Sequence, residues 1–292
     1  MAVAAIGFFD GVHLGHRLVL ETLLSEAERR GERSLIITFW PHPRLVLDSG
    51  AESLRLLTTK SERLSLLEQV GPSEIITEGF DSEFASMSAE EYLGRLRCNN
   101  DLTAIVAGYD TRLGSDRKGP EELEKVCARL GLDCVRVPEF PAPVSSTRIR
   151  AALSKGNVES ASEMLGYRFG ICGHVVHGNK IGRTLGFPTA NLGLLDPVKA
   201  VPAPGAYLTE VLLGEEIHYG MTNVGVRPTV GESSETVIET NIFDFDEEIY
   251  GRQMTLRFVR RVRAEVKFPG LDALRAQLLA DRRTCNDIID TL

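Results

Sequence analysis

Short apolar segments alternate with amphipathic segments through the first half of the 292-residue chain. Four apolar stretches have the length of strands: 3–9, 34–40, 73–80 and 102–110. Two segments have the periodicity of helices: one with Leu20, Leu23, Leu24 and Ala27 on a single face, and one at 88–97. Buried strands separated by such helices predict a parallel sheet with helices on both faces. Ligands bind such sheets at the carboxyl ends of the strands.

The second half has a different pattern. Its segments are short, apolar and separated by Gly and Pro: 169–178, 205–214, 216–225, 236–245 and 254–266. Short strands at regular spacing predict an antiparallel barrel. The last apolar residues recur at helical spacing and predict one amphipathic helix packed on that barrel: Leu271, Leu274, Leu278 and Leu279. A helical segment at 147–166 joins the halves, so we expect domains at 1–166 and 167–292.

Composition narrows the class of protein. Hydrophobic residues make up 43% and charged residues 25%, which is typical of a globular protein with a core. The 33 Lys and Arg against 41 Asp and Glu give a net charge of -8. We therefore expect neither nucleic acid nor a membrane surface as the main partner.

The cysteines and the first residues indicate the compartment. Five scattered cysteines without a Cys-x-x-Cys pair favour neither a disulfide framework nor a zinc site, so a reducing cytoplasm is expected. The apolar start has no basic leader and is interrupted by Asp10, which favours a buried strand over a signal peptide. Apolar stretches are also shorter than the roughly 18 residues that a membrane span needs.

The segment IGFFDGVHLGH, residues 6–16, follows the first expected strand. His13 and His16 are three residues apart, so both would lie on one side of the first turn of a helix. The free N–H groups of such a turn attract anions, and Gly11 lets a phosphate approach the backbone. Two imidazoles at that point can donate hydrogen bonds to phosphate oxygens as negative charge develops in a transition state. The alternative is a Gly-Asp turn with locally packed histidines.

The segment VSSTRIR, residues 144–150, precedes an expected helix. Ser145, Ser146 and Thr147 are residues that commonly cap helices, and the two arginines that follow are typical of a solvated surface. Hydroxyls and Arg at a helix start also form an anion site, and two such sites in one chain favour a polyphosphate.

In GRTLGFPTANLG, residues 182–193, Thr189 and Asn191 flank Ala190. In an extended chain both side chains point the same way. Oxygen ligands in that arrangement suit Mg²⁺, which combines one or two protein oxygens with water and phosphate. A proline-bounded loop is the alternative.

Glu239 is the carboxylate that the pattern singles out in the second half. It is expected on the same strand face as Val237, Phe243 and Phe245. A carboxylate among apolar neighbours either faces an open pocket or has a raised pKa. An exposed barrel edge explains the pattern equally well.

Taken together, these segments resemble one family over nearly the whole chain: the bifunctional bacterial riboflavin kinase/FAD synthetases. GFFDGVHLGH resembles the family's G-x-F-D-G-V-H-x-G-H, GYDTRLGSDRKG its G-x-D-F-x-F-G region, and SSTRIR its S-S-T-x-I-R. GRTLGFPTANL, GMTNVGVRPT, IETNIFDF with DEEIYG, and LRAQLLAD continue the match in order. The first motif is shared by many nucleotidyltransferases, whereas GRTLGFPTAN is far more specific.

The resemblance implies an α/β Rossmann-like nucleotidyltransferase domain followed by an antiparallel β-barrel riboflavin kinase domain with a C-terminal helix. It implies riboflavin, FMN and ATP as substrates, Mg²⁺ as cofactor, and phosphorylation of riboflavin to FMN followed by adenylyl transfer to give FAD and pyrophosphate.

The residue roles that the resemblance implies fall into four groups. Catalytic roles go to Glu239, His13, His16 and Arg148. ATP binding goes to Gly7, Phe9, Asp10, Gly11, Asp110, Ser146, Thr147, Gly182, Thr189 and Asn191. Flavin binding goes to Asn223, Arg227 and Phe243, and metal binding to Thr189 and Asn191.

The chemistry of the two steps agrees with this division. The nucleophile of adenylyl transfer is a phosphate oxygen that is already anionic, so positioning and charge stabilisation suffice. The nucleophile of the kinase step is a neutral hydroxyl whose proton needs an acceptor. Glu239, in the second half, is the candidate for that acceptor.

This chain departs from the family pattern at a few positions. Thr111 and Leu113 stand where aromatic residues are usual, Trp40 where an acidic residue is common, and Asn241 where histidine is frequent. Loss of two rings predicts weaker FMN binding in the first domain. Two alternatives to the bifunctional enzyme are therefore a riboflavin kinase with a degraded first domain and a flavin-binding module without turnover.

Overall fold

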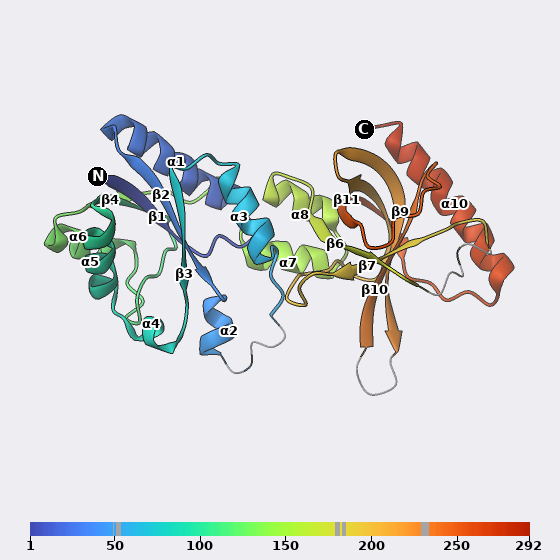
Figure 1. Ribbon diagram of the computed structural model, residues 1–292, viewed down its shortest axis with the longest axis horizontal. Coiled ribbons are helices and arrows are strands. Elements are labelled where there is room, and N and C mark those ends of the chain that lie inside the picture. The colour runs from blue at the N-terminus through green and yellow to red at the C-terminus, as the bar shows by residue number, and fades with distance from the viewer. Residues whose placement is uncertain (49, 51–53, 179–181, 183–184, 229–233) are drawn as a thin grey trace. The chain divides into compact units, whose positions relative to one another are not determined.

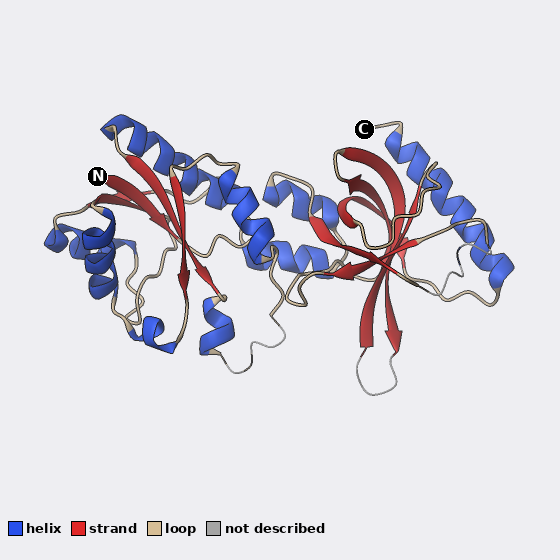
Figure 2. Ribbon diagram, viewed as in Figure 1, coloured by secondary structure: helices blue, strands red, loops and turns tan. Residues whose placement is uncertain are grey.

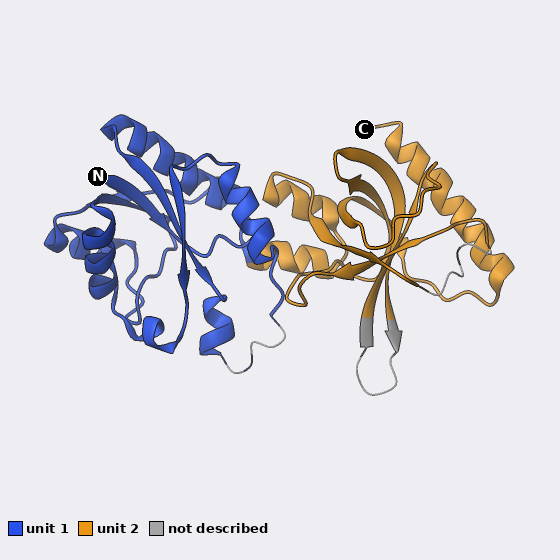
Figure 3. Ribbon diagram, in the orientation of Figure 1, with its two compact units in different colours: residues 1–146 blue, residues 147–292 orange. Residues whose placement is uncertain are grey.

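The computed structural model describes residues 1–48, 50, 54–178, 182, 185–228 and 234–292. The chain forms two compact units, Met1–Ser146 and Thr147–Leu292 (Figure 3). Each unit has its own sheet and its own core.

Five strands form the sheet of the first unit, in the order β3-β2-β1-β4-β5. All neighbouring pairs are parallel. The strands are β1 (Ala2–Ile6), β2 (Arg33–Trp40), β3 (Glu74–Gly79), β4 (Leu102–Ala107) and β5 (Asp133–Arg136). The helices are α1 (Leu14–Arg30), α2 (Pro43–Leu47), α3 (Lys60–Glu68), α4 (Ser82–Ser86), α5 (Ala89–Asn100) and α6 (Pro120–Leu130).

Successive residues of β1 face opposite sides of this sheet, as they must in a strand. Ala2 and Ala4 belong to one buried cluster with residues of α5 and α6. Val3 and Ala5 belong to a second cluster with residues of α1 and α3. Helices therefore cover both faces, as Figures 1 and 2 show. The parallel α/β sheet predicted for the first half is confirmed.

The chain leaves β1 earlier than the apolar pattern predicts. The strand ends at Ile6, and Phe9 and Val12 have φ values of 56° and 39°. Such positive values lie outside the β region of backbone conformations. The residues up to His13 therefore form a turn at the carboxyl end of the strand.

Six strands of the second unit form a closed barrel, in the order β10-β7-β6-β11-β8-β9. All six contacts around it are antiparallel. The strands are β6 (Gly170–Val176), β7 (Ala190–Leu194), β8 (Gly205–Leu213), β9 (Glu216–Pro228), β10 (Ser234–Ile242) and β11 (Gln253–Ala264). The predicted antiparallel barrel is confirmed.

Three further helices accompany the barrel among the described residues: α7 (Ser146–Ser154), α8 (Val158–Leu165) and α10 (Leu271–Ile289). The C-terminal helix is confirmed, and Leu274 and Leu278 pack against the core of this unit as predicted, whereas Leu271 and Leu279 are exposed. Asp281, Cys285 and Ile288 are buried instead. Asp281 forms an ion pair of 2.8 Å with Arg263 of β11, which holds this side of the helix on the barrel.

Candidate active sites

The turn after β1 places two histidine rings against each other. His13 caps the N-terminus of α1, and its Nδ1 accepts a hydrogen bond of 3.2 Å from the backbone N–H of His16. The two rings stack with centroids 3.6 Å apart, and the Phe9 ring meets His16 edge-on at 5.4 Å. Since Nδ1 of His13 accepts, a neutral His13 carries its proton on Nε2.

The surroundings of His16 lower the pKa of its ring. Its Nδ1 is buried and has no hydrogen-bond partner among the described residues. Burial, and to a lesser degree the neighbouring His13, keep the pKa of His16 well below its ordinary value of 6.5. Two stacked neutral imidazoles can donate hydrogen bonds to an anion, whereas two charged ones would repel each other.

Asp10 holds this turn in place. The residue is 4% exposed, and its Oδ1 accepts from the N–H of Leu57 at 2.9 Å and from the N–H and hydroxyl of Thr58. The N–H of Gly11 donates to the same Thr58 hydroxyl at 3.1 Å. Gly11 has φ 80°, a conformation that costs glycine little. The carboxylate thereby ties the turn to the residues that precede α3.

Two other predicted residues lie at the same turn. The hydroxyl of Ser146 donates to the backbone carbonyl of Asp10 at 3.0 Å. The N–H of Gly7 donates to the carbonyl of Ile37 in β2 at 3.0 Å, so the chain stays bonded to the sheet just after β1 ends.

Asp110 follows β4, the strand that pairs with β1. Because neighbouring parallel strands end at one edge of the sheet, Asp110 and the histidine turn share that edge. Asp110 is exposed. Leu113 points elsewhere, since it is buried in the cluster of α5 and α6.

Sequence reasoning missed an aromatic group at this edge. Phe8 stacks on Trp40 at 6.5 Å and meets His42 edge-on at 4.2 Å. The Arg63 guanidinium lies over the Phe8 ring at 3.8 Å and is completely buried. Burial lowers the pKa of Arg63 to about 10, although the charge of Asp10 opposes the shift. The sequence signal was available, because Arg63 and Leu67 are four residues apart on the buried face of α3.

The Ser-Ser-Thr-x-Ile-Arg segment crosses from one unit to the other. Helix α7 begins at Ser146, the last residue of the first unit, and Thr147 and Arg148 belong to the second. Thr147 and Arg148 are both exposed. The arginine that ends the motif is Arg150, which is half-buried and whose Nη2 lies 3.5 Å from the Thr147 hydroxyl. The catalytic arginine expected in this segment is Arg148, and Arg150 is not among the expected site residues.

In the second unit, Glu239 of β10 is paired with Asn191 of β7 on one side and Asn223 of β9 on the other. Directly opposed residues of antiparallel strands point to the same face of a sheet. Asn191 is 9% exposed, Glu239 is half-buried and Asn223 is exposed. We call these three residues the polar row.

The prediction that Glu239 shares its strand face with Val237, Phe243 and Phe245 is only partly correct. Val237 shares its face of β10, but Phe243 and Phe245 lie beyond Ile242, where the strand ends. Asp244 between them has φ 53°, so the chain turns and the alternation stops. Phe243 is buried in the cluster that packs against α10, with the Arg282 guanidinium 4.6 Å from its ring.

The opposite face of β10 lines a cavity of about 450 Å³. Its walls include Thr240 and Ile242 of β10, Val175 of β6, Pro188 and Thr189 before β7, and the 245–250 segment. Successive residues of a strand face opposite ways, so Thr240 belongs to the cavity while Glu239 belongs to the polar row. Thr189 borders the cavity immediately before Ala190 begins β7.

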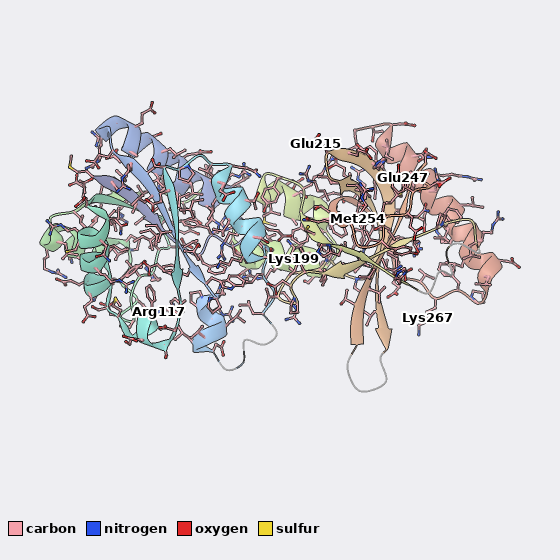
Figure 4. The ribbon with its side chains drawn as sticks, in the orientation of Figure 1. Arg117, Lys199, Glu215, Glu247, Met254 and Lys267 are labelled. Carbon is pink, nitrogen blue, oxygen red and sulfur yellow. The ribbon has the colours of Figure 1, made fainter. Side chains whose placement is uncertain are left out.

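The cavity has an acidic rim and a polar wall. Asp246, Glu247 and Glu248 line it, and Glu247 is labelled in Figure 4. Behind Thr240, a chain of buried hydroxyls runs through Thr222 at 2.9 Å and on to Thr209 at 2.7 Å.

Close backbone approach explains two glycines beside these residues. A Cβ atom on Gly178 would overlap the amide of Asn191, with Cγ only 2.5 Å away. A Cβ atom on Gly182 would overlap the carbonyl of Phe187 and would lie 3.3 Å from Oγ1 of Thr189. Both glycines therefore let the chain pass close to the predicted metal ligands. The side chain of Arg227 lies outside the described residues, although its backbone pairs with Glu235.

The described residues contain no group of three or more His, Cys, Asp or Glu side chains able to hold a metal ion. Thr189 and Asn191 nevertheless offer the neutral oxygens that Mg²⁺ accepts when phosphate and water complete its shell. The donor set therefore fits a metal that arrives with a nucleotide.

Comparison with known proteins decides the family. A FAD synthetase family model matches residues 1–149, and a riboflavin kinase family model matches residues 165–289. The chain belongs to the bifunctional riboflavin kinase/FAD synthetase family. It thus has both activities: it phosphorylates riboflavin to FMN and transfers the adenylyl group of ATP to FMN.

Similar proteins span nearly the whole chain. The bifunctional riboflavin kinase/FMN adenylyltransferase of Bacillus subtilis is 36% identical over 290 residues, which cover 97% of this chain and 90% of that protein. The Escherichia coli K12 protein of the same name is 35% identical over 291 residues, with 98% and 92% covered. A Streptococcus pneumoniae crystal structure described as a macrolide-efflux protein matches with a TM-score of 0.90 and 34% identity, covering 98% of this chain and 93% of that one.

Among the described residues, no helix is both long enough and apolar enough to cross a membrane.

Proposed function

We propose that riboflavin is phosphorylated on the polar row of the barrel, with Glu239 as the general base. The observation that carries this proposal is the register that pairs Glu239 with Asn191 and Asn223. A ribityl hydroxyl must lose its proton as it attacks phosphorus, and a carboxylate within reach can accept it. The proposed flavin-binding residues remain Asn223, Arg227 and Phe243. Because Phe243 is buried, it would support the flavin site by packing below the surface residues.

We further propose that ATP bends around the start of β7. The three carboxylates at the cavity rim repel phosphate, so the cavity suits the uncharged base of the nucleotide. Thr189 borders the cavity just before β7 begins, and Asn191 lies two positions further along the chain, on the polar row. A nucleotide whose phosphates pass Thr189 would bring the transferred group to the Glu239 side. Gly182 is then a close-approach residue beside those phosphates.

Mg²⁺ is proposed to bind with the nucleotide at Thr189 and Asn191. When bound, the ion neutralises phosphate charge during transfer. The residues of this chain orient it, and the hydroxyl of Thr189 and the amide oxygen of Asn191 are the proposed contacts. Glu239 is not needed as a metal ligand, since neutral ligands suffice for a metal that phosphates already hold.

Adenylyl transfer is proposed to occur at the histidine turn of the first unit. His13 and His16 would donate hydrogen bonds as charge develops on the phosphates, and neither needs to remove a proton. Gly7, Phe9, Gly11, Asp110, Ser146 and Thr147 remain proposed ATP-binding residues, with Asp10 supporting the turn. Arg148 remains a proposed catalytic residue, and we add Arg150 because it occupies the arginine position of the family motif.

We propose a cytoplasmic enzyme with functional domains at 1–166 and 167–292 and without a nucleic-acid or membrane partner. The net charge of -8 and the absence of disulfides among the five cysteines support this assignment.

Incubation with riboflavin, ATP and Mg²⁺, followed by separation of the flavins, tests the proposed division of labour. Glu239→Gln should stop FMN formation, while FMN supplied directly should still become FAD. If Glu239→Gln slows both steps equally, the proposed division is wrong.

A further inference from the structure

Asn241 lies two residues after Glu239 on the same face of β10. Its Nδ2 donates a hydrogen bond of 2.7 Å to the backbone carbonyl of Pro188. The residue is only 4% exposed. The bond spans 53 positions of the sequence and joins β10 to the segment that leads into β7.

The place of this bond in the ladder explains what it does. Between β10 and β7 the paired residues are Glu239 with Asn191 and Thr240 with Ala190. Continued by one step, the register would pair Asn241 with Thr189, but β7 begins only at Ala190. The side-chain amide of Asn241 therefore continues the connection where the backbone ladder between these two strands stops.

The other polar atom of the Asn241 amide is its oxygen, Oδ1. Oδ1 of Asn241 is buried and has no hydrogen-bond partner among the described residues. A buried acceptor without a donor costs free energy, and an apolar side chain would avoid that cost. Folding alone thus gives little reason for an amide at this position, whereas the bond to Pro188 gives a specific one.

We propose that Asn241 is a positioning residue of the kinase reaction, holding Pro188 so that the adjacent Thr189 faces Mg²⁺-ATP. The inference rests on the role proposed for Thr189. The proposed role requires no contact of Asn241 itself with substrate or metal. Asn241 acts through one peptide unit, because fixing the carbonyl of Pro188 fixes the plane that leads to the Cα atom of Thr189.

Asn241→Leu removes the donor and also the unpartnered acceptor. We expect the apparent KM for Mg²⁺-ATP in FMN formation to rise about five- to tenfold, the scale of one lost hydrogen bond. The KM for riboflavin should change less than twofold, and the thermal midpoint of unfolding should stay the same or rise. Adenylyl transfer by the first unit, measured on the same preparation with FMN, should be unchanged.

Asn241→His supplies a ring N–H donor at the same position and is the conservative variant. It should restore the KM for Mg²⁺-ATP to within about twofold of the wild-type value. If Asn241→His behaves like Asn241→Leu, the hydrogen bond is not the relevant property and the proposal fails. A fall in thermal midpoint with equal increases in both KM values would also overturn it, because that result indicates a structural role.

Thr189→Val separates this inference from the role proposed for Thr189. If Thr189→Val leaves the kinase unchanged, the proposed role of Thr189 is wrong. If it impairs the kinase while Asn241→Leu does not, the positioning role of Asn241 is wrong. If Asn241 acts through Thr189, adding Asn241→Leu to Thr189→Val should raise the KM for Mg²⁺-ATP no further, as a double-mutant cycle reports. A full additional increase in the double variant would contradict the proposal.

Discussion

Glu239 and Asn191 are direct partners across β10 and β7, with Asn223 completing the row on β9. They come from segments about fifty positions apart in the sequence, yet their side chains leave the same face of the barrel. A proposed base and a proposed metal ligand thus lie within one row of a rigid sheet. Such placement keeps both groups oriented before substrate arrives, which is the main contribution a protein makes to phosphoryl transfer.

Replacement of Glu239 by Gln should reduce the rate of FMN formation by at least about 10²-fold, the scale of a lost general base. The amide keeps the shape of the side chain but cannot accept the hydroxyl proton. Chromatographic separation of riboflavin, FMN and FAD measures the effect. Glu215→Gln, an exposed change between β8 and β9, is the matched control (Figure 4). Equal rates in the two variants would remove Glu239 from the mechanism.

His16→Ala should slow the conversion of FMN to FAD by roughly 10²–10³, the cost of one lost transition-state donor. The riboflavin kinase rate should not change, because His16 belongs to the other unit. His174→Ala, an exposed change on β6, serves as control. Release of pyrophosphate from FMN and ATP is the measurement, and an unaltered rate would contradict the assignment.

The lowered pKa of His16 predicts a dependence of stability on pH. Below about pH 6.5 an unfolded histidine binds a proton that the folded ring refuses, so the unfolded state gains protons and stability falls. The contribution of His16 is therefore complete above that pH and is lost as the pH falls toward the lower folded pKa. The fall in thermal midpoint between about pH 7.5 and 5.5 should be smaller in His16→Gln than in the wild type. Equal falls would contradict the burial argument.

Chelation of divalent metal should stop FMN formation, and added Mg²⁺ should restore it. The described residues contain no group of three or more His, Cys, Asp or Glu side chains able to hold a metal ion, so Mg²⁺ alone should not raise the thermal midpoint. Mg²⁺ together with ADP should raise it, because phosphates complete the coordination shell. Strong stabilisation by Mg²⁺ without nucleotide would show that the metal has a site of its own.

Gly178→Ala should impair the kinase step while leaving adenylyl transfer intact. The added Cβ atom would overlap the amide of Asn191 and force that side chain from the polar row. Gly270→Ala is the control, since a Cβ atom there meets nothing within 4 Å. Both rates measured on one preparation distinguish a local effect from general unfolding. Normal FMN formation in Gly178→Ala would mean that the position of Asn191 does not matter.

Local patterns were enough to predict both architectures. Strands with apolar runs, helices at the spacing of Leu20 and Leu23, and short strands punctuated by glycine led to the sheet and the barrel. These features follow from the direction of the side chains, which repeats about every 2.0 residues in a strand and about every 3.6 residues in a helix. This repeat can be read directly from the sequence. The pattern failed where the backbone departs from those periods, at the positive φ values of Phe9 and Asp244.

Long-range contacts could not be predicted in the same way. Nothing local to Leu271 or Leu279 indicates that Asp281 will be buried instead, because an ion pair with Arg263 of β11 decides it. The spacing of Arg63 and Leu67 indicates that Arg63 is buried, but not that its guanidinium meets Phe8, which lies in the turn after β1.

By itself, then, the sequence determined the fold class, the family and the kinds of chemical groups available. The tertiary structure alone decided which of those groups meet: the stacked His13 and His16, the row through Glu239, and the bond from Asn241 to Pro188. The physical reason is that residue type and spacing control conformation over a few positions. Register between strands is set by the packing of whole elements, and it brings distant positions to one face.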